Sequence, residues 1–261
     1  MKVGIGCAVY ISNDTHFQYA KETIESIKSA EHELEFCFVV NYLSKTEYRA
    51  YLESVGTVFD NIENIVSRSW NRSISHLLST GCDYVIVPNL DLIFKSNLVD
   101  NLVKFAEDSK DKFILWTALP WGEKESIEEA IEGEGYPETP HFSCFMVDGR
   151  LFERVGSFDE NFRAAYNEDL DMHYRIKLEG EVAVGFEGAR FFHQGGGSRT
   201  IKSDPVLEQR NHITHDANNK FFEAKWRYKP PTASDEFTKD MYKFPFNDPE
   251  YVDEFGPKHE R

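Results

Sequence analysis

The segment YVIVPNLD, residues 84–91, carries the clearest signature of the fold. Its first four residues form an unbroken apolar run of strand length, and two side chains with oxygen donors, Asn89 and Asp91, follow directly. Ligands of open parallel sheets bind beyond the carboxyl ends of the strands. Asn89 and Asp91 therefore stand where a ligand is expected, although an Asn-x-Asp sequence after a strand is also a common turn.

Strand and helix patterns alternate on both sides of this segment. Before it we expect strands at 3–11, 34–42 and 64–67, and helices at 16–30, 44–55 and 70–79. Thr15 is a candidate cap for the first helix, and Ser44 with Glu47 predicts a capping box at the second. Unbroken apolar strands that alternate with helices predict a parallel sheet covered on both faces.

The pattern continues after the segment, with one interruption. We expect helices at 96–109, 149–155, 168–179 and 204–226, and strands at 113–118, 142–147 and 182–186. Residues 121–138 carry seven glutamates against one lysine, which is typical of a solvated surface segment but also fits a flap over a site. After Pro230-Pro231 no periodicity remains, so we expect a tail that wraps the body.

Composition bounds the class of protein. The 261 residues suffice for one well-buried domain or two small ones, and a net charge of −16 disfavours sequence-blind binding to nucleic-acid backbones. No apolar stretch approaches the length that crosses a bilayer, and the first residues lack a secretory signal pattern. The four cysteines show no metal-type spacing and three lie in apolar runs, so we expect a reduced, cytoplasmic protein without membrane contact.

Two more clusters carry chemistry. Acidic residues crowd the start of the helix expected at 168–179, where Glu168, Asp169 and Asp171 either favour the helix dipole or supply a general base. The segment FFHQGGGSR, residues 191–199, places His193 and Arg199 around three glycines whose N–H groups can bind phosphate. A flexible glycine hinge beside a packed histidine explains that segment equally well.

Taken in order, these segments resemble those of a family 2 glycosyltransferase of the GT-A fold, over roughly residues 3–226. The DxD-type motif of that family is matched by Asn89-Leu90-Asp91, with Asn in the first position. The family's G-x-F-D-E-x-F segment and following E-D are matched by GSFDENF at 156–162 and by Glu168-Asp169. His193 to Ser198 match its late His near a Gly/Ser loop, and Lys225-Trp226 match its K-W helix end.

The resemblance implies an α/β architecture with a mostly parallel central sheet, flanking helices, a C-terminal helix and an irregular tail. Residues 1–202 would then form the catalytic domain, in which 1–95 are the nucleotide-sugar half and 96–202 the acceptor half. Residues 203–261 would add the C-terminal helix and the wrapping tail.

The activity implied is metal-dependent, inverting transfer of a hexosyl or pentosyl group from a nucleotide-sugar, commonly a UDP-sugar, to a hydroxyl of a soluble acceptor. Asp91, His193 and Asn89 would hold Mn²⁺ or Mg²⁺ against the donor diphosphate, since the leaving group needs its charge neutralised. Asp169, with Glu168 beside it, would deprotonate the acceptor. The donor-binding candidates are Ala8, Val9, Tyr10, Asn41, Arg68, Asn71, Asn89 and Arg199.

The sequence departs from the family at two positions. Asn41 stands where the family carries an acid that reads uracil, which leaves the base open, and Asn89 weakens or removes one metal ligand. A non-catalytic module that binds a nucleotide-sugar or glycan is therefore an alternative. Residues 10–14 lack the Gly-rich basic loop of a sugar nucleotidyltransferase, which disfavours that class.

A modified DNA acceptor is the other alternative. Between residues 190 and 230, eight Lys or Arg face four acids, for a local charge of +4. Such a face on an acidic protein could hold DNA carrying a hydroxymethylated base, which phage-type glycosyltransferases modify. A solvated helix whose cations gather near the donor phosphates explains the same charges.

Overall fold

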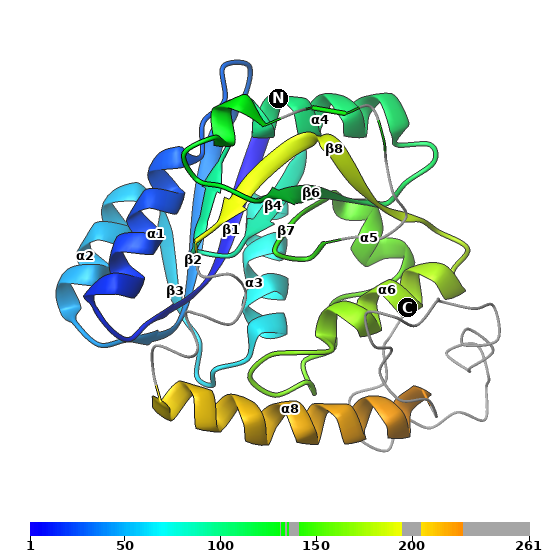
Figure 1. The fold of residues 1–261 in the computed structure, drawn as a ribbon. Helices are drawn as coiled ribbons and strands as arrows, with labels where there is room; N and C mark the ends of the chain where they lie inside the picture. Colours follow the sequence, from blue (N-terminus) through cyan, green and yellow to red (C-terminus); the bar gives the residue numbers. More distant parts are fainter. Residues whose placement is uncertain (131, 134, 136–140, 195–204, 227–261) are drawn as a thin grey trace.

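An eight-stranded sheet runs through the part of the chain that the computed structural model describes, which is residues 1–130, 132–133, 135, 141–194 and 205–226 (Figure 1). The strands are β1 Lys2–Ile11, β2 Glu33–Leu43, β3 Thr57–Asp60, β4 Tyr84–Pro88, β5 Leu92–Phe94, β6 Leu115–Trp121, β7 Cys144–Val147 and β8 Ala183–His193. Their order across the sheet is β3-β2-β1-β4-β7-β6-β8-β5.

The first half of the sheet is parallel, as the alternating pattern predicts. β1 pairs in parallel with both β2 and β4, and β2 pairs in parallel with β3. The second half is mixed, because β7 runs antiparallel to β4 and β6, and β5 runs antiparallel to β8. β6 and β8 are parallel neighbours.

Helices cover both faces of this sheet. They are α1 Asp14–Ser26, α2 Thr46–Val55, α3 Val66–Ser79, α4 Leu98–Ser109, α5 Gly149–Arg154, α6 Glu168–Leu178 and α8 Pro205–Trp226, with a short 3₁₀ turn η1 at Ile127–Glu129. One core cluster joins the odd-numbered side chains of β1 to α1, α2 and α4, and a second joins the opposite face of the sheet to α3, α5 and α6. The expected α/β fold is confirmed.

Two glycines of β1 let α3 pack directly against the strand. A Cβ at Gly4 would lie 2.8 Å from Leu77 Cβ, and one at Gly6 would lie 2.7 Å from Ser73 Oγ. Any side chain at these two positions would push the helix away from the sheet. The glycines thus set the depth at which α3 sits beneath the carboxyl edge of β1.

Several local expectations need correction. The strand expected at 64–67 is wrong: β3 lies at Thr57–Asp60, and α3 already begins at Val66. A single bridge from Ile65 to Ala164 is the β interaction made there.

The capping box predicted at Ser44 is also wrong, because α2 begins at Thr46 after Lys45 and has no side-chain cap. Asn13, not Thr15, caps α1, since its side chain accepts from the N–H of His16.

One strand, β5, was not expected from the sequence, and another, β8, is longer than the sequence pattern predicts. β5 is only three residues long, too short for periodicity to reveal, and it exists because it pairs with β8. β8 continues to His193 rather than ending at Phe186, because a register shift opposite Ala118 and Leu119 lets the strand resume beyond Gly188. These two additions bring the segment after β4 beside the end of β8.

The acidic segment is attached to α4 over the residues described. The Glu128 carboxylate accepts hydrogen bonds from the main-chain N–H of Ser96 at 3.1 Å and from its hydroxyl at 2.8 Å. Glu132 forms an ion pair with Lys95 and accepts from Asn97 Nδ2 at 2.8 Å. Carboxylates at the N-terminal end of a helix are stabilised by its dipole. Glu128 and Glu132 therefore attach the described part of the acidic segment to the start of α4.

The four cysteines are buried free thiols. The apolar runs predicted this for Cys7, Cys37 and Cys144, but not for Cys82. Burial raises the pKa of the Cys37 thiol to about 12.

The cytoplasmic location of the protein stays a prediction. None of the helices in the described ranges combines the length and hydropathy that crossing a bilayer requires.

α8 packs across the carboxyl edge, below α3 and α6 in Figure 1. Phe222 and Trp226 form a small core with Phe162 and Tyr174, which ties the helix to α6 and to the turn before it. One continuous sheet runs through both expected halves of the 1–202 unit. The tail after residue 226 lies outside the described residues.

Candidate functional site

A cavity of about 780 Å³ opens at the carboxyl ends of β1, β2 and β4. Its other walls come from the turn after β3, the start of α1, the loop at 163–165, and α8. It is lined by Ala8, Tyr10, Ile11, His16, Tyr19, Asn41, Tyr42, residues 62–66, Trp70, residues 88–91, residues 163–165 and Thr214. The expected ligand site beyond the strand ends is therefore a real cavity, and Ala8, Tyr10, Asn41, Asn89 and Asp91 line it.

Asp91 and His193 meet at the edge of this cavity. The pairing of Leu92 with His193 in β5 and β8, and a 2.7 Å bond from the Gln194 N–H to the Asp91 carbonyl, hold the two segments together. His193 Nε2 then lies 3.0 Å from Asp91 Oδ1. Both side chains are mostly buried, at 14% and 13% exposed. Two of the residues expected at a metal are therefore adjacent.

The 3.0 Å contact of this pair has the length of a hydrogen bond, and two ligands of one cation can have the same separation. Ligands at about 2.1 Å from a metal and at right angles to each other are about 3.0 Å apart. A carboxylate oxygen and an imidazole nitrogen suit Mn²⁺, while Mg²⁺ prefers oxygen ligands throughout. No group of three His, Cys, Asp or Glu side chains with metal-binding geometry occurs among the described residues. Further ligands would have to come from Asn89, water or a bound diphosphate.

Asn89 itself sits at the turn between β4 and β5. Its main-chain N–H donates to the Ser143 carbonyl at 2.8 Å, which joins the turn to the start of β7. Its side chain lies in the cavity wall beside Leu90 and Asp91.

Aromatic and amide side chains form the opposite wall. The rings of Tyr10 and Tyr42 lie 5.2 Å apart, and Tyr42 is 46% exposed. Asn41 Oδ1 accepts from Asn61 Nδ2 at 3.0 Å and from Ser69 Oγ at 3.1 Å. Because the Asn41 oxygen accepts both bonds, Asn41 would bind a ligand through its amide N–H₂, as a hydrogen-bond donor.

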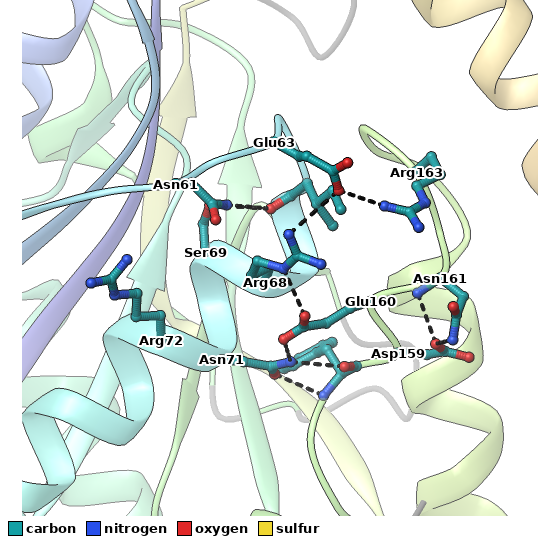
Figure 2. A network of polar contacts seen from close by, with 12 residues as sticks. Asn61, Glu63, Arg68, Ser69, Asn71, Arg72, Asp159, Glu160, Asn161 and Arg163 are labelled. Carbon is teal, nitrogen blue, oxygen red and sulfur yellow. Dashed lines mark hydrogen bonds and ion pairs between the residues drawn. The ribbon is translucent and has the colours of Figure 1, made fainter. Parts of the chain in front are cut away.

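Three of the donor-binding candidates are engaged elsewhere. Val9 is fully buried in the core beneath the cavity. Asn71 links α3 to the turn after α5, since its Oδ1 accepts from the Phe158 N–H and its Nδ2 donates to the Phe158 carbonyl, both at 2.8 Å. Arg68 donates to Glu160 at 2.8 Å and contacts Glu63 (Figure 2). Arg199 lies outside the described residues.

The polar network of Figure 2 also includes an ion pair between Glu63 and Arg163. Glu63, on the turn after β3, accepts from Arg163 at 2.7 Å, and both residues line the cavity. Their side chains are more than half exposed, so the pair is weak and salt-sensitive. It nevertheless joins the donor side of the cavity to the loop at 163–165.

Glu168 and Asp169 begin α6, directly after that loop. Glu168 is only 5% exposed, and its Oε2 has no hydrogen-bond partner in the described structure. Burial raises the pKa of Glu168 well above its ordinary value, and the adjacent Asp169 carboxylate raises it further. Burial also raises the pKa of Asp169, against the opposing effect of main-chain N–H groups. Neither residue is among those that line the cavity, but both follow closely on residues 163–165, which do.

Several cavity residues were not expected from the sequence. His16 and Tyr19 lie on α1, and His16 Nδ1 is 3.1 Å from Ser12 Oγ. The Asn13 cap, a signal readable in the sequence, starts the helix at the sheet edge and so places His16 there. Arg163 and Thr214 reach the cavity through tertiary packing alone, and no local pattern marks them.

The basic stretch expected between residues 190 and 230 is not a uniform exposed face. Lys225 is completely buried and paired with Asp159 and Asp171. Lys220 is exposed but lies 2.8 Å from Asp216. Lys225 is therefore not available to a polyanion.

Comparison with known proteins places the fold. No protein-family model matches the chain, and no curated protein matches it in sequence. A solved structure that it resembles is the crystal structure of GalNAc-T7 with UDP, GalNAc and Mn²⁺, at 12% identity and a TM-score of 0.58. The likeness covers 86% of this chain and 50% of that one, so this chain spans half the length of its structural neighbour. The α/β architecture of GT-A type is confirmed, while membership of family 2 stays a prediction.

Proposed function

We propose that the chain is a metal-dependent, inverting glycosyltransferase. It would transfer a hexosyl or pentosyl group from a nucleotide-sugar, with UDP-sugars as first candidates, to a hydroxyl of an acceptor. The observation that carries the proposal is the Asp91–His193 pair at the rim of a cavity beyond the strand ends. The likeness in fold to a protein crystallised with UDP, GalNAc and Mn²⁺ supports the same assignment.

Asp91 and His193 would hold the cation, with Asn89 beside them. When bound, Mn²⁺ or Mg²⁺ neutralises negative charge on the diphosphate leaving group. The nucleoside would lie against Ala8 and Tyr10, with Asn41 offering an N–H donor to an acceptor atom of the base. A cavity of about 780 Å³ lies within the range of small-molecule sites.

Asp169 would act as the general base, with Glu168 next in line. In a single displacement, the acceptor oxygen bonds to the anomeric carbon while the bond from that carbon to the phosphate oxygen breaks. The hydroxyl proton passes to Asp169, and the nucleoside diphosphate leaves. A carboxylate whose pKa is raised by burial is the stronger base once deprotonated.

A non-catalytic module that binds nucleotide-sugars remains the alternative, because Asn89 replaces an acid in the metal-binding motif. Such a module would bind UDP with Mn²⁺ but release no nucleoside diphosphate. Modified DNA has no supporting contact on the described residues, so carbohydrate and protein hydroxyls are the acceptors to test first.

The test is a transfer assay with the full chain. Purified protein with Mn²⁺ is given a panel of nucleotide-sugars and then small sugars, peptides, and plain or hydroxymethylated DNA, with products scored by mass. Transfer to any acceptor, lost in Asp169→Asn, supports the proposal, and proton NMR of the product reports inversion. Tight UDP binding without hydrolysis or transfer from any donor would favour the binding module.

A further inference from the structure

The loop at 163–167, which forms one wall of the cavity, holds unusual backbone geometry. Ala164, Tyr166 and Asn167 have φ angles of 51°, 85° and 72°. Residues with a Cβ rarely adopt this left-handed region, and they persist there only when surrounding contacts enforce it. Asparagine adopts this region more readily than other residues, so the strain lies at Ala164 and Tyr166, and contacts from elsewhere, here called the clamp, must hold the loop.

Asn218 of α8 supplies that clamp. Its Nδ2 lies 2.9 Å from each of three carbonyl oxygens, those of Arg163, Ala165 and Tyr166. Its Oδ1 accepts from the N–H of Arg163 at 3.0 Å. The side chain is 2% exposed, so water does not replace these bonds. A carboxamide alone among side chains of this size both donates and accepts in this way.

The clamped loop contacts both sides of the site. The Ala164 carbonyl accepts from the Val66 N–H at 2.8 Å, which ties the loop to the start of α3. Residues 163–165 line the cavity, and the loop leads directly into Glu168 and Asp169. The main-chain N–H of Tyr166 also stabilises the Glu168 carboxylate. A shift of this loop would therefore move the cavity wall and both carboxylates together.

Residues of α8 other than Asn218 also contact the rest of the molecule. Thr214, one turn earlier on the same face of α8, lines the cavity. The last turns of the helix are attached independently, by the packing of Phe222 and by the bond from Trp226 Nε1 to Asp171 Oδ1 at 2.9 Å.

We propose that Asn218 is a positioning residue. Through the 163–167 loop it sets the acceptor-side wall of the cavity and the placement of Glu168 and Asp169. This inference rests on the proposed function and deepens it, because it assigns to α8 a role in acceptor use that is separate from donor binding.

The experiment compares Asn218→Ala and Asn218→Asp with two control variants on the same helix. Asn218→Asp keeps the acceptor for the Arg163 N–H but cannot donate to the three carbonyls. Trp226→Phe loosens the attachment of α8 without touching the loop, and Lys220→Ala removes an exposed charge. Each full-length protein is measured for thermal stability, amide hydrogen exchange, UDP binding with Mn²⁺, and steady-state transfer.

Asn218→Ala should speed exchange of the Arg163 and Val66 amides, whereas Asn218→Asp, which keeps the acceptor for the Arg163 N–H, should speed exchange of Val66. Both variants should leave the Kd for UDP within about two-fold of wild type. Transfer, measured as kcat/KM for the acceptor, should fall by about a hundred-fold, because small misplacements of catalytic groups have effects of that size. Trp226→Phe should lower the melting temperature without either change. Ala164→Gly should recover part of the activity of Asn218→Ala, since glycine adopts positive φ without strain.

The outcomes separate the two proposals. If wild type transfers sugar and the Asn218 variants behave like Trp226→Phe or Lys220→Ala, the positioning role is wrong and the proposed function stands. If wild type transfers no sugar from any donor, the proposed function is wrong, and the positioning role falls with it. If Asn218→Ala does not fold, Asn218→Asp is compared with Trp226→Phe and Lys220→Ala in its place, and Ala164→Gly is added to Asn218→Asp as the rescue.

Discussion

Lys225 Nζ lies 2.5 Å from Asp159 Oδ2, and both side chains are shut off from solvent. The same ammonium is 2.8 Å from Asp171 Oδ1, whose other oxygen accepts from Arg175 Nε at 3.0 Å. Two cations thus balance two carboxylates in a buried cluster that joins α8, α6 and the turn before α6. Asp159 and Lys225 belong to the GSFDENF and K-W segments, so both motifs have a structural role here.

Replacing Lys225 by methionine should destabilise the protein by about 3–5 kcal/mol, because two buried carboxylates lose their shared partner. Urea unfolding followed by circular dichroism measures the change. Lys220→Met, in an exposed pair on the same helix, should leave the unfolding midpoint close to wild type. Equal effects of the two variants would contradict the buried ion pair.

Activity should require a divalent metal, and Mn²⁺ should support it better than Mg²⁺. Asp91→Ala and His193→Ala should each weaken Mn²⁺-dependent UDP binding, because each removes one of two adjacent ligands. Calorimetric titration with UDP, with and without Mn²⁺, separates this loss from a general loss of affinity. Full transfer in EDTA would show that the pair serves another purpose.

Asp169→Asn should lower turnover by about a hundred- to ten-thousand-fold, since that is the usual effect of removing a general base. The Kd for the nucleotide-sugar should stay near that of wild type, because Asp169 does not line the cavity. Pre-steady-state release of nucleoside diphosphate, beside direct donor binding, measures both. Near-normal turnover would move the base to Glu168, because Asp171 is buried and paired with Lys225 and Arg175.

Glu168 should make the stability of the protein depend on pH. Burial raises its pKa in the folded state, so the folded protein keeps this proton to higher pH than the unfolded chain. The free energy of unfolding should therefore fall as pH rises from about 4, the ordinary glutamate value, through the raised pKa.

The variant that isolates this effect is Glu168→Gln, which does not titrate. Its stability relative to wild type should improve as pH rises from about 4 through the raised pKa of Glu168. Urea unfolding of both proteins across that range measures the difference. Titrating groups that do not interact with Glu168 cancel in the comparison, whereas Asp169 and Asp171 contribute to it because their charges act on Glu168. A difference that is constant with pH would rule out a raised pKa at Glu168.

The sequence by itself determined the elements whose buried residues are consecutive or regularly spaced along the chain. β1, β2 and β4 are unbroken apolar runs, and their order with the intervening helices was enough to predict a parallel half-sheet with Asn89 and Asp91 at its edge. Short-range periodicity encodes these features because each depends on neighbouring residues. The cap of α1 was predicted at Thr15, whereas Asn13 is the residue that caps the helix.

Tertiary structure decided everything that depends on pairing between distant segments. The three-residue β5 exists only beside β8, and this pairing brings Asp91 to 3.0 Å from His193. The burial of Lys225, which composition places on a basic face, follows from the docking of α8 onto α6. The positive φ angles at Ala164 and Tyr166 occur in residues that rarely adopt them, so no local propensity predicts them. Asn218 enforces them from another element, through contacts that no short stretch of sequence contains.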